Sequence, residues 1–263
     1  MITIAHIVPQ RGVNDDGKGK KFALSQLIRQ VDSDYVWLHD DDVIMPQATL
    51  RQAAEMIEEL AFPDMVILPL TMSEPTTIAG AENAPLKRLF IRLQQTEYAL
   101  LQAITMRTAL RHKPIMCSGA NLIVKRSEWL QSEAALHHEI PSGDDMFLLE
   151  DFKKRHLRIC ALNHPYYTAA IQPIINIRQF FHQRMRWAGK ADKYQDHDIQ
   201  LFGIVSTIWL IAQALNPWLS IISTAIVRAI TPQPIIITFV LMLIYPYYAL
   251  ICLIGGLFRQ QKW

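Results

Sequence analysis

The sequence predicts an α/β domain on a mostly parallel β-sheet over residues 1–198, followed by a membrane region over residues 199–258. Two observations support this. In the first part, short apolar runs of strand type alternate with segments whose apolar residues recur at helical spacing, as in sheets covered by helices. In the second part, Arg228 is the only charged residue, although charged residues make up 19% of the chain. Such a stretch indicates a lipid environment rather than water.

The elements of the first part can be taken in chain order. Strands are expected at residues 2–8, 35–38, 65–70, 117–124 and 157–162. Helices are expected at residues 21–31, 46–60, 86–110, 127–131, 144–156 and 178–193. Pro46 is expected to open the second helix, because proline suits a first helical position. The last helix is basic and aromatic and leads into the uncharged stretch as an interfacial helix.

The uncharged stretch has room for two transmembrane spans, at about residues 201–227 and 234–258. Roughly 20 apolar residues in a helix cross the hydrocarbon core of a bilayer. Asn216-Pro217 interrupts the first stretch, so a hairpin or re-entrant segment remains an alternative to one crossing. A pair of buried core helices is a second alternative, although so long a run with one charge is extreme for a soluble core.

Basic residues flank the two spans unevenly. Arg259 and Lys262 follow the second span, Arg228 alone lies between the spans, and a basic group precedes the first: Arg178, Arg184, Arg186, Lys190 and Lys193. The positive-inside rule then predicts a multi-pass protein of the cell membrane whose first domain is cytoplasmic.

The net charge of +2 is too small to suggest nucleic acid as a partner. Three widely spaced cysteines without a CxxC pattern argue against a zinc site or a disulfide framework.

Three aspartates in a row follow the predicted strand at residues 35–38. Because alternate residues of an extended chain face the same way, Asp40 and Asp42 can converge on one ion. Carboxylate oxygens suit Mg²⁺ or Mn²⁺, and such ions commonly hold substrate phosphates as well. By itself, a solvated acidic turn explains the triplet equally well.

A second acidic group, Ser142-Gly143-Asp144-Asp145, opens the predicted helix at residues 144–156. One of these carboxylates, held at a rigid helix start, could act as a general base. Acidic residues are also common at helix N-termini because they favour the helix dipole, so this pair alone is not specific.

The third group is Gln183-Arg184-Met185-Arg186-Trp187. On a helix Gln183 and Arg186 share a face, since they are three residues apart. A guanidinium can bind a diphosphate through two hydrogen bonds, and an indole offers a stacking surface for a sugar ring. A basic, aromatic helix at the lipid headgroups is an equally good explanation of this group alone.

Taken in this order, the three groups resemble the motifs of membrane-bound glycosyltransferases of family 2, which include cellulose and hyaluronan synthases. The family's Asp-x-Asp resembles residues 40–42, its acidic pair resembles residues 144–145, and its Gln-x-x-Arg-Trp is matched at residues 183–187. Residues 19–24 (Gly-Lys-Lys-Phe-Ala-Leu) and 118–121 (Ser-Gly-Ala-Asn) are weaker similarities. The resemblance spans roughly residues 17–263.

This resemblance implies a GT-A-like fold and an inverting, metal-dependent transfer of a sugar to an acceptor hydroxyl at the membrane. It implies that Asp40 and Asp42 hold Mg²⁺ or Mn²⁺, and that Asp145 is the base, with Asp144 beside it. Binding of the donor diphosphate and the acceptor falls to Gln183, Arg186, Trp187, Lys21 and Gly119. The implied partners are a nucleoside-diphosphate sugar, a saccharide or lipid-linked acceptor and the bilayer.

The chain departs from the family pattern near its start. The family usually begins with a strand, an acidic loop that binds the nucleotide base, and a helix, but only 39 residues precede Asp40. Asp15 and Asp16 come too late for the acidic loop. We therefore expect an incomplete GT-A-like domain that lacks the first strands, and a catalytically inactive remnant is the alternative. A phosphohydrolase would explain the carboxylates but not residues 183–187.

Overall fold

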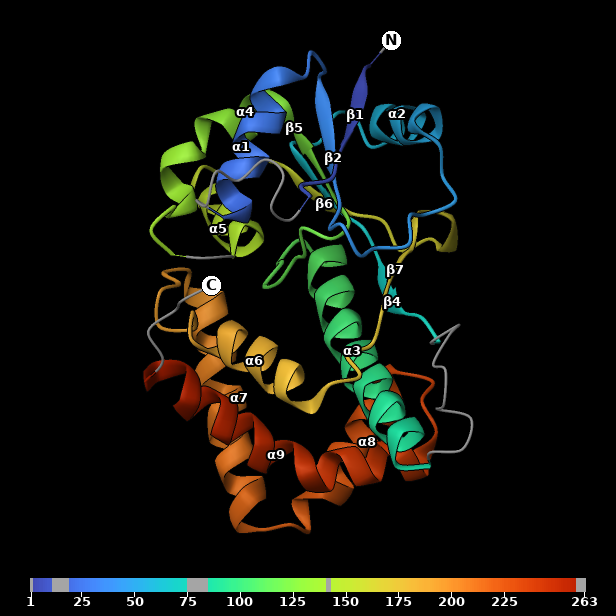
Figure 1. Cartoon of the computed structure of the whole chain (residues 1–263), viewed down its shortest axis with the longest axis vertical. Coiled ribbons are helices and arrows are strands. Elements are labelled where there is room, and N and C mark those ends of the chain that lie inside the picture. Colours follow the sequence, from blue (N-terminus) through green and yellow to red (C-terminus); the bar gives the residue numbers. More distant parts are fainter. Residues whose placement is uncertain (1, 11–18, 75–84, 141–142, 259–263) are drawn as a thin grey trace. The chain divides into compact units, whose positions relative to one another are not determined.

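The computed structural model describes residues 2–10, 19–74, 85–140 and 143–258 (Figure 1). It divides into two compact units. The first comprises residues 1–70, 105–171 and 261–263, and the second comprises residues 71–104 and 172–260. Asp15, Asp16, Ser142, Arg259 and Lys262, which entered the sequence analysis, lie outside the described residues.

A five-stranded sheet with the order β1-β2-β5-β3-β6 forms the centre of the first unit. Its strands are β1 (Ile4–Ile7), β2 (Tyr35–Leu38), β3 (Met65–Ile67), β5 (Leu122–Lys125) and β6 (Ile159–Ala161). β1 is parallel to β2 and β3 is parallel to β6, whereas β5 runs antiparallel to both of its neighbours. The predicted α/β class with a mostly parallel sheet is confirmed, with one reversed strand. Two further strands, β4 (Leu70–Met72) and β7 (Ala169–Ile171), form a separate pair.

Helices cover both faces of this sheet. They are α1 (Lys20–Gln30), α2 (Leu50–Glu59), α4 (Arg126–Gln131) and α5 (Asp144–Lys154). All four residues of β2 are buried because alternate side chains enter two different cores. Val36 and Leu38 pack in a core with residues of α1 and α5, and Tyr35 and Trp37 pack in a core with residues of α2. Burial on both faces explains why this strand reads as a continuous apolar run.

α2 begins four residues later than Pro46, where the sequence analysis placed its start. Thr49 caps the helix: its hydroxyl accepts a hydrogen bond from the Gln52 amide at 3.3 Å. In return, Gln52 Oε1 accepts one from the Thr49 amide at 2.9 Å. This reciprocal capping box satisfies two amides at the helix start, so the cap and not the proline sets the boundary.

The second unit is helical. It contains α6 (Ile177–Ala188), α7 (His197–Leu215), α8 (Leu219–Ile230), α9 (Ile235–Phe258) and the part of α3 (Pro85–Leu110) that precedes Thr105. α7 and α9 are long and apolar enough to cross a membrane, by length and composition. Asn216-Pro217 separates α7 from the shorter apolar helix α8, so the stretch at residues 201–227 forms two helices rather than one.

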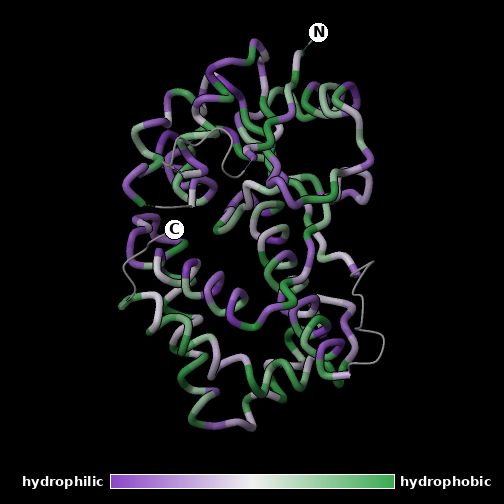
Figure 2. The backbone as a smooth tube through the Cα atoms, in the orientation of Figure 1, coloured by the Kyte–Doolittle hydropathy of each residue, from purple (hydrophilic) through white to green (hydrophobic). Residues whose placement is uncertain are grey.

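The bundle of α7, α8 and α9 buries a polar network beside a small apolar core, and much of its outer surface is apolar. The amide of Gln213 is buried and donates to the Met242 carbonyl at 2.5 Å and to Ser220 Oγ at 3.1 Å. It accepts from Ser223 Oγ at 2.8 Å. Figure 2 shows that the residues of these helices are mostly hydrophobic. Large apolar side chains are exposed along them, among them Ile204, Ile208, Leu215, Ile222, Ile226 and Ile236. This distribution is the reverse of that in a water-soluble bundle.

α6 is held firmly within the second unit. A Cβ atom on Gly256 of α9 would lie 2.7 Å from the Gly189 nitrogen, just beyond the end of α6, so the two backbones touch. The Phe180 ring packs edge-on to Phe90 of α3 at a centroid distance of 5.3 Å, and it lies 5.9 Å from the ring of Tyr248 in α9. Residues 183–187 therefore sit on a helix that is packed against both α3 and α9.

Candidate active site

Four separate segments of the first unit bring charged or polar groups to one place. Asp40 follows β2, Lys20 is the first residue of α1, Asp144 and Asp145 are the first two residues of α5, and Gly119 lies in the loop before β5. All of these residues except Lys20 were candidates on sequence grounds. They come from distant parts of the chain, and the sheet with its helices positions them together.

One ammonium group bridges two of the carboxylates. Lys20 Nζ lies 2.5 Å from Asp40 Oδ1 and 3.6 Å from Asp144 Oδ2. A Cβ atom on Gly119 would come within 3.3 Å of Asp144 Oδ2 and 3.6 Å of Lys20 Nζ. The lack of a side chain at Gly119 therefore lets its backbone approach Asp144 and Lys20 closely.

Both helices that supply charges begin after a glycine with a left-handed backbone. The φ angles are 87° at Gly19 and 81° at Gly143, values that residues other than glycine rarely adopt. This geometry sets the direction in which the first residue of each helix points. It also places two carboxylates in the first turn of α5, where the positive end of the helix dipole stabilises negative charge.

The two aspartates at the start of α5 have different surroundings. Asp144 is buried, with 5% of its surface exposed, and its carboxylate faces Lys20. Asp145 is only half-buried, and it accepts hydrogen bonds from the Met146 amide at 2.8 Å and the Gly119 amide at 3.2 Å. Asp145 is therefore held in place by backbone donors and yet is more accessible than Asp144. These are the properties a general base needs.

Among the described residues of this cluster, three carboxylates lie around one ammonium group. Burial disfavours the charged form of Lys20, but the carboxylates of Asp144 and Asp40 outweigh this effect and hold the pKa of Lys20 above its ordinary value. The ammonium is thus charged at neutral pH and faces three carboxylates, those of Asp40, Asp144 and Asp145. A further cation would reduce the remaining repulsion.

The donor set suits a hard divalent cation, because carboxylate oxygens are the ligands that Mg²⁺ and Mn²⁺ prefer. Asp42, the second predicted ligand, is exposed in the turn that follows β2. Across the described part of the chain, no three His, Cys, Asp or Glu side chains are gathered in an arrangement that could hold a metal. The residues thus fit such an ion by their chemistry, without a ready-made ligand cage.

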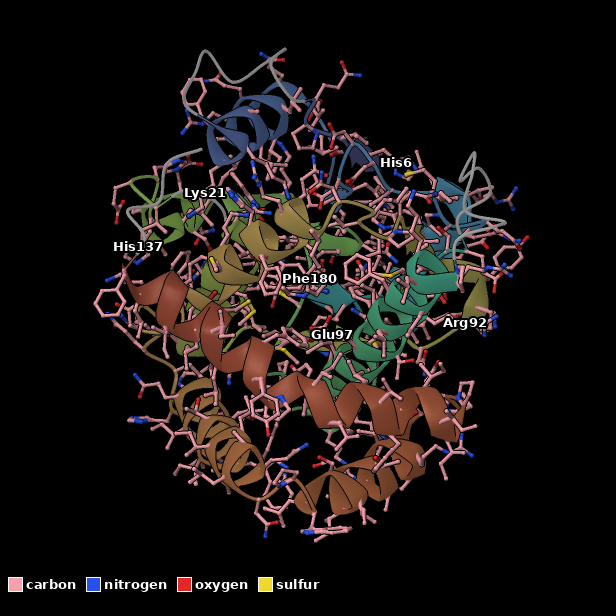
Figure 3. All side chains as sticks on the ribbon, turned by 60° about the horizontal axis from the view of Figure 1, so that its bottom comes forward. His6, Lys21, Arg92, Glu97, His137 and Phe180 are labelled. Carbon is pink, nitrogen blue, oxygen red and sulfur yellow. The ribbon has the colours of Figure 1, made fainter. Side chains whose placement is uncertain are left out.

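Lys21, which the sequence analysis expected to bind the donor, points elsewhere. It is 3% exposed, and its ammonium donates to the carbonyls of Leu136 at 2.5 Å and His137 at 2.9 Å (Figure 3). It also lies 4.7 Å from the centre of the Phe147 ring. These contacts tie α1 to the turn before α5. The lysine beside the acidic cluster is Lys20, and the Gly-Lys pair at residues 19–20 was the signal for it.

In the second unit, the segment at residues 183–187 surrounds a buried ion pair. Arg184 Nη2 lies 2.7 Å from Glu97 Oε2, and the two side chains are 7% and 4% exposed. The guanidinium carbon lies 4.5 Å from the Phe180 ring centre and 4.4 Å from that of Trp187 (Figure 3 labels Glu97 and Phe180). Arg184 Nη1 donates to Gln183 Oε1 at 2.5 Å. Arg184 therefore contacts two of the three predicted binding residues.

Arg184 and Glu97 were missed by the sequence analysis. The available signal was Glu97, which is the only acidic residue of α3. A carboxylate that becomes buried when its helix packs needs a cationic partner. Burial disfavours the charge of Arg184, but Glu97 raises the pKa of Arg184 above its ordinary value. Arg186 is half-buried and Trp187 is 37% exposed, so these two side chains remain partly accessible.

Comparisons with known proteins agree with the predicted family. A family model described as glycosyltransferase like family 2 matches residues 3–190, well over half of the chain. A search among curated proteins gave no match. Several solved structures are distantly similar. S. aureus TarS residues 1–349 is 14% identical with a TM-score of 0.38, covering 70% of this chain and 48% of that one.

The same TarS fragment in complex with UDP is 13% identical, with a TM-score of 0.42 and coverage of 88% of this chain and 72% of that one. A mycobacterial protein is 14% identical, with a TM-score of 0.33 and coverage of 68% and 53%. The chain thus spans about half the length of the first of these structures. The structural likeness is too distant to support any functional argument, so the assignment rests on the family model.

Proposed function

Since the chain belongs to glycosyltransferase like family 2, we propose that it transfers a sugar from a nucleoside-diphosphate sugar to an acceptor hydroxyl at a membrane. The observation that carries this proposal is the cluster of Lys20, Asp40, Asp144, Asp145 and the Gly119 amide. The cluster lies wholly inside the matched residues and combines a candidate base with three carboxylates around one ammonium.

In the proposed reaction Asp145 takes the proton from the acceptor hydroxyl. The hydroxyl oxygen forms a bond to the anomeric carbon while the bond from that carbon to the diphosphate oxygen breaks. Attack from the side opposite the diphosphate inverts the configuration, and the nucleoside diphosphate leaves. Asp145 suits this role better than Asp144, because Asp144 is buried against Lys20.

The diphosphate leaving group needs positive charge around it. Asp40 and Asp42 would hold Mg²⁺ or Mn²⁺, which would neutralise charge on the phosphates when bound. Lys20 supplies a fixed positive charge at the same place, since its ammonium already contacts Asp40. In the second unit, Gln183 and Arg186 are proposed to bind the diphosphate, and Trp187 offers its exposed ring to the acceptor sugar.

We also propose that α7 and α9 are embedded in a bilayer. Their length and composition permit it. The buried polar network around Gln213 and the exposed isoleucines give a further reason, because lipid-facing surfaces are apolar and polar groups must find partners inside the bundle. The basic residues before α7 favour a multi-pass arrangement with the first unit in the cytoplasm. The acceptor would then be a saccharide or a lipid-linked molecule.

The test is release of nucleoside diphosphate by the purified full chain from a panel of nucleotide sugars, with and without Mg²⁺ or Mn²⁺. Asp145→Asn should lower the transfer rate by about 10²- to 10⁴-fold, the usual contribution of a general base. Nucleotide binding, measured by calorimetry, should persist. Glu150→Gln on the same helix is the matched control and should keep the wild-type rate.

Transfer by Asp145→Asn at the wild-type rate would refute the assignment of the base. Failure of every donor to release its nucleotide, in a folded protein that also binds no nucleotide, would instead favour the inactive remnant. Turnover that does not change when divalent cations are removed would reject metal dependence but leave the transferase standing.

A further inference from the structure

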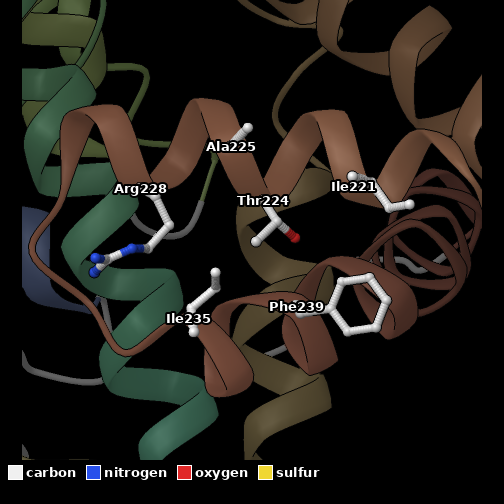
Figure 4. A pocket seen from close by; sticks show the side chains of 6 residues that line it. All are labelled: Ile221, Thr224, Ala225, Arg228, Ile235 and Phe239. Atoms are coloured by element: carbon white, nitrogen blue, oxygen red, sulfur yellow. The ribbon is translucent and has the colours of Figure 1, made fainter.

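An apolar pocket lies between α8 and α9 in the second unit. It is lined by Ile221, Thr224, Ala225 and Arg228 of α8 and by Ile235 and Phe239 of α9. Figure 4 shows Arg228 at one end of this lining and Ile221 and Phe239 at the other. The pocket therefore has an apolar wall and a single cationic end.

Arg228 is the only charge among residues 199–258. An ionisable residue inside such an apolar stretch is costly and usually has a specific partner. Within the described residues, its only hydrogen bond is to the Gln233 carbonyl in the turn between α8 and α9. A guanidinium has five N–H donors, so this contact leaves most of them available to a ligand.

More positive charge lies close by. The apolar core of Val227, Leu241 and Met242 is completed by Leu93 of α3, which places the first turns of α3 beside the ends of α8 and α9 (Figure 1). Arg92, next to Leu93, and Arg88, one turn earlier, are exposed. The only acidic residue of α3 is Glu97, which is paired with Arg184. Arg88 and Arg92 thus add exposed positive charge to a helix that packs against the core shared by α8 and α9.

We propose that this pocket binds an anionic phospholipid. One acyl chain lies along Ile221, Ala225, Ile235 and Phe239, and the phosphate binds Arg228. The residues that line the pocket suit such a lipid. The apolar wall can contact a hydrocarbon chain, and the guanidinium can bind a phosphate through two parallel hydrogen bonds. Exposed apolar residues next to the wall, such as Ile222 and Ile226, fit a surface surrounded by lipid. The proposal does not depend on transferase activity.

The test uses the full chain purified in a neutral detergent. Phosphatidylglycerol and phosphatidylcholine with identical acyl chains are added, and bound lipid is counted by native mass spectrometry while thermal unfolding is followed. Wild type should bind phosphatidylglycerol about fivefold more tightly, the effect of one basic side chain near a lipid surface. Arg228→Gln should abolish this preference, and Arg228→Lys should keep much of it. Arg51→Gln, at an exposed arginine of α2, is the control.

A second pair of variants tests the apolar wall. Ala225→Trp fills the pocket and should weaken binding of both lipids, whereas Ile222→Trp, on the exposed side of α8 outside the lining, should not. Equal affinity of wild type for the two lipids would overturn the proposal, as would an unchanged preference in Arg228→Gln. If Ala225→Trp instead dissociates a dimer and leaves lipid binding intact, the pocket is a contact between copies and the proposal is wrong.

Discussion

Each of the two units contains a cluster of charged side chains. The clusters differ in their exposure to solvent and in their ratio of positive to negative groups. In the first unit, the side chains of Lys20 and Asp40 are 25% and 36% exposed, and one ammonium faces three carboxylates. In the second unit, Arg184 and Glu97 are 7% and 4% exposed and neutralise each other. The side chains of the first cluster are partly accessible, and its described carboxylates outnumber its ammonium group, as in a site that binds a cation. The second cluster is buried and its two charges neutralise each other.

The closed pair also organises its surroundings. Arg184 lies between the rings of Phe180 and Trp187 and donates to Gln183, so one side chain fixes two members of the predicted Gln-x-x-Arg-Trp group. Cation–π contacts in a desolvated place strengthen such an arrangement. A balanced, buried pair therefore works as a scaffold for neighbouring side chains and not as a ligand site.

The largest stability effect is expected at the closed pair. Arg184→Met leaves the Glu97 carboxylate buried without its partner, which should reduce the free energy of unfolding by about 3–5 kcal/mol. Unfolding of the detergent-solubilised protein by denaturant, followed by circular dichroism, measures this. The double variant Glu97→Met/Arg184→Met should recover most of the loss, because no buried charge then remains.

A loss under about 1 kcal/mol in Arg184→Met would mean that Glu97 reaches water, and the contrast between the clusters would fail. Arg51→Met is a suitable control. Its ion pair with Glu55 is highly exposed, with side-chain exposures of 85% and 55%, so its removal should have little effect on stability.

The acidic residues of the first cluster could be predicted from the sequence, whereas the ion pair of the second could not. The acidic groups of the first follow a buried strand or open a helix, and such positions can be recognised from local pattern. Whether Lys20 or Lys21 faces them depends on the backbone turn at Gly19, which the pattern does not reveal. The pairing of Glu97 with Arg184 depends on packing between helices far apart in the chain. The reversed direction of β5 was missed because a short apolar run carries no sign of its orientation.

His39, beside Asp40, gives a second prediction, on pH. Its ring is fully buried, its Nδ1 lies 3.2 Å from the Ala120 carbonyl, and its Nε2 has no hydrogen-bond partner among the described residues. Burial, followed by the nearby His6, lowers the pKa of His39 from 6.5 to about 4. Between these two pH values the unfolded chain takes up a proton that the folded protein does not. Stability is therefore lost as the pH falls below 6.5.

The expected loss from this one group is about 3 kcal/mol between pH 6.5 and pH 4. His39→Asn should remove it, so the variant's unfolding free energy should change less over this range than that of the wild type. His164→Asn is the control, since His164 precedes the short helix Pro165–Tyr167 and is exposed. Parallel pH curves for wild type and His39→Asn would show that the His39 ring is not the source of acid sensitivity and that water reaches it.

The smallest of these three effects on stability is expected at Lys20. This prediction directly tests whether the first cluster is a ligand site and the second a structural ion pair. Lys20 and Asp40 are partly exposed, and Asp144 is the buried member of the group, so Lys20→Met should reduce the unfolding free energy by about 1–2 kcal/mol, less than Arg184→Met. The same change removes the ammonium that faces three carboxylates, so Mn²⁺ should bind about fivefold more tightly to the nucleotide-free protein, as calorimetry can measure. Asp40→Asn should weaken Mn²⁺ binding instead. If Lys20→Met destabilises the protein as strongly as Arg184→Met and leaves Mn²⁺ affinity unchanged, the first cluster is a structural ion pair like the second.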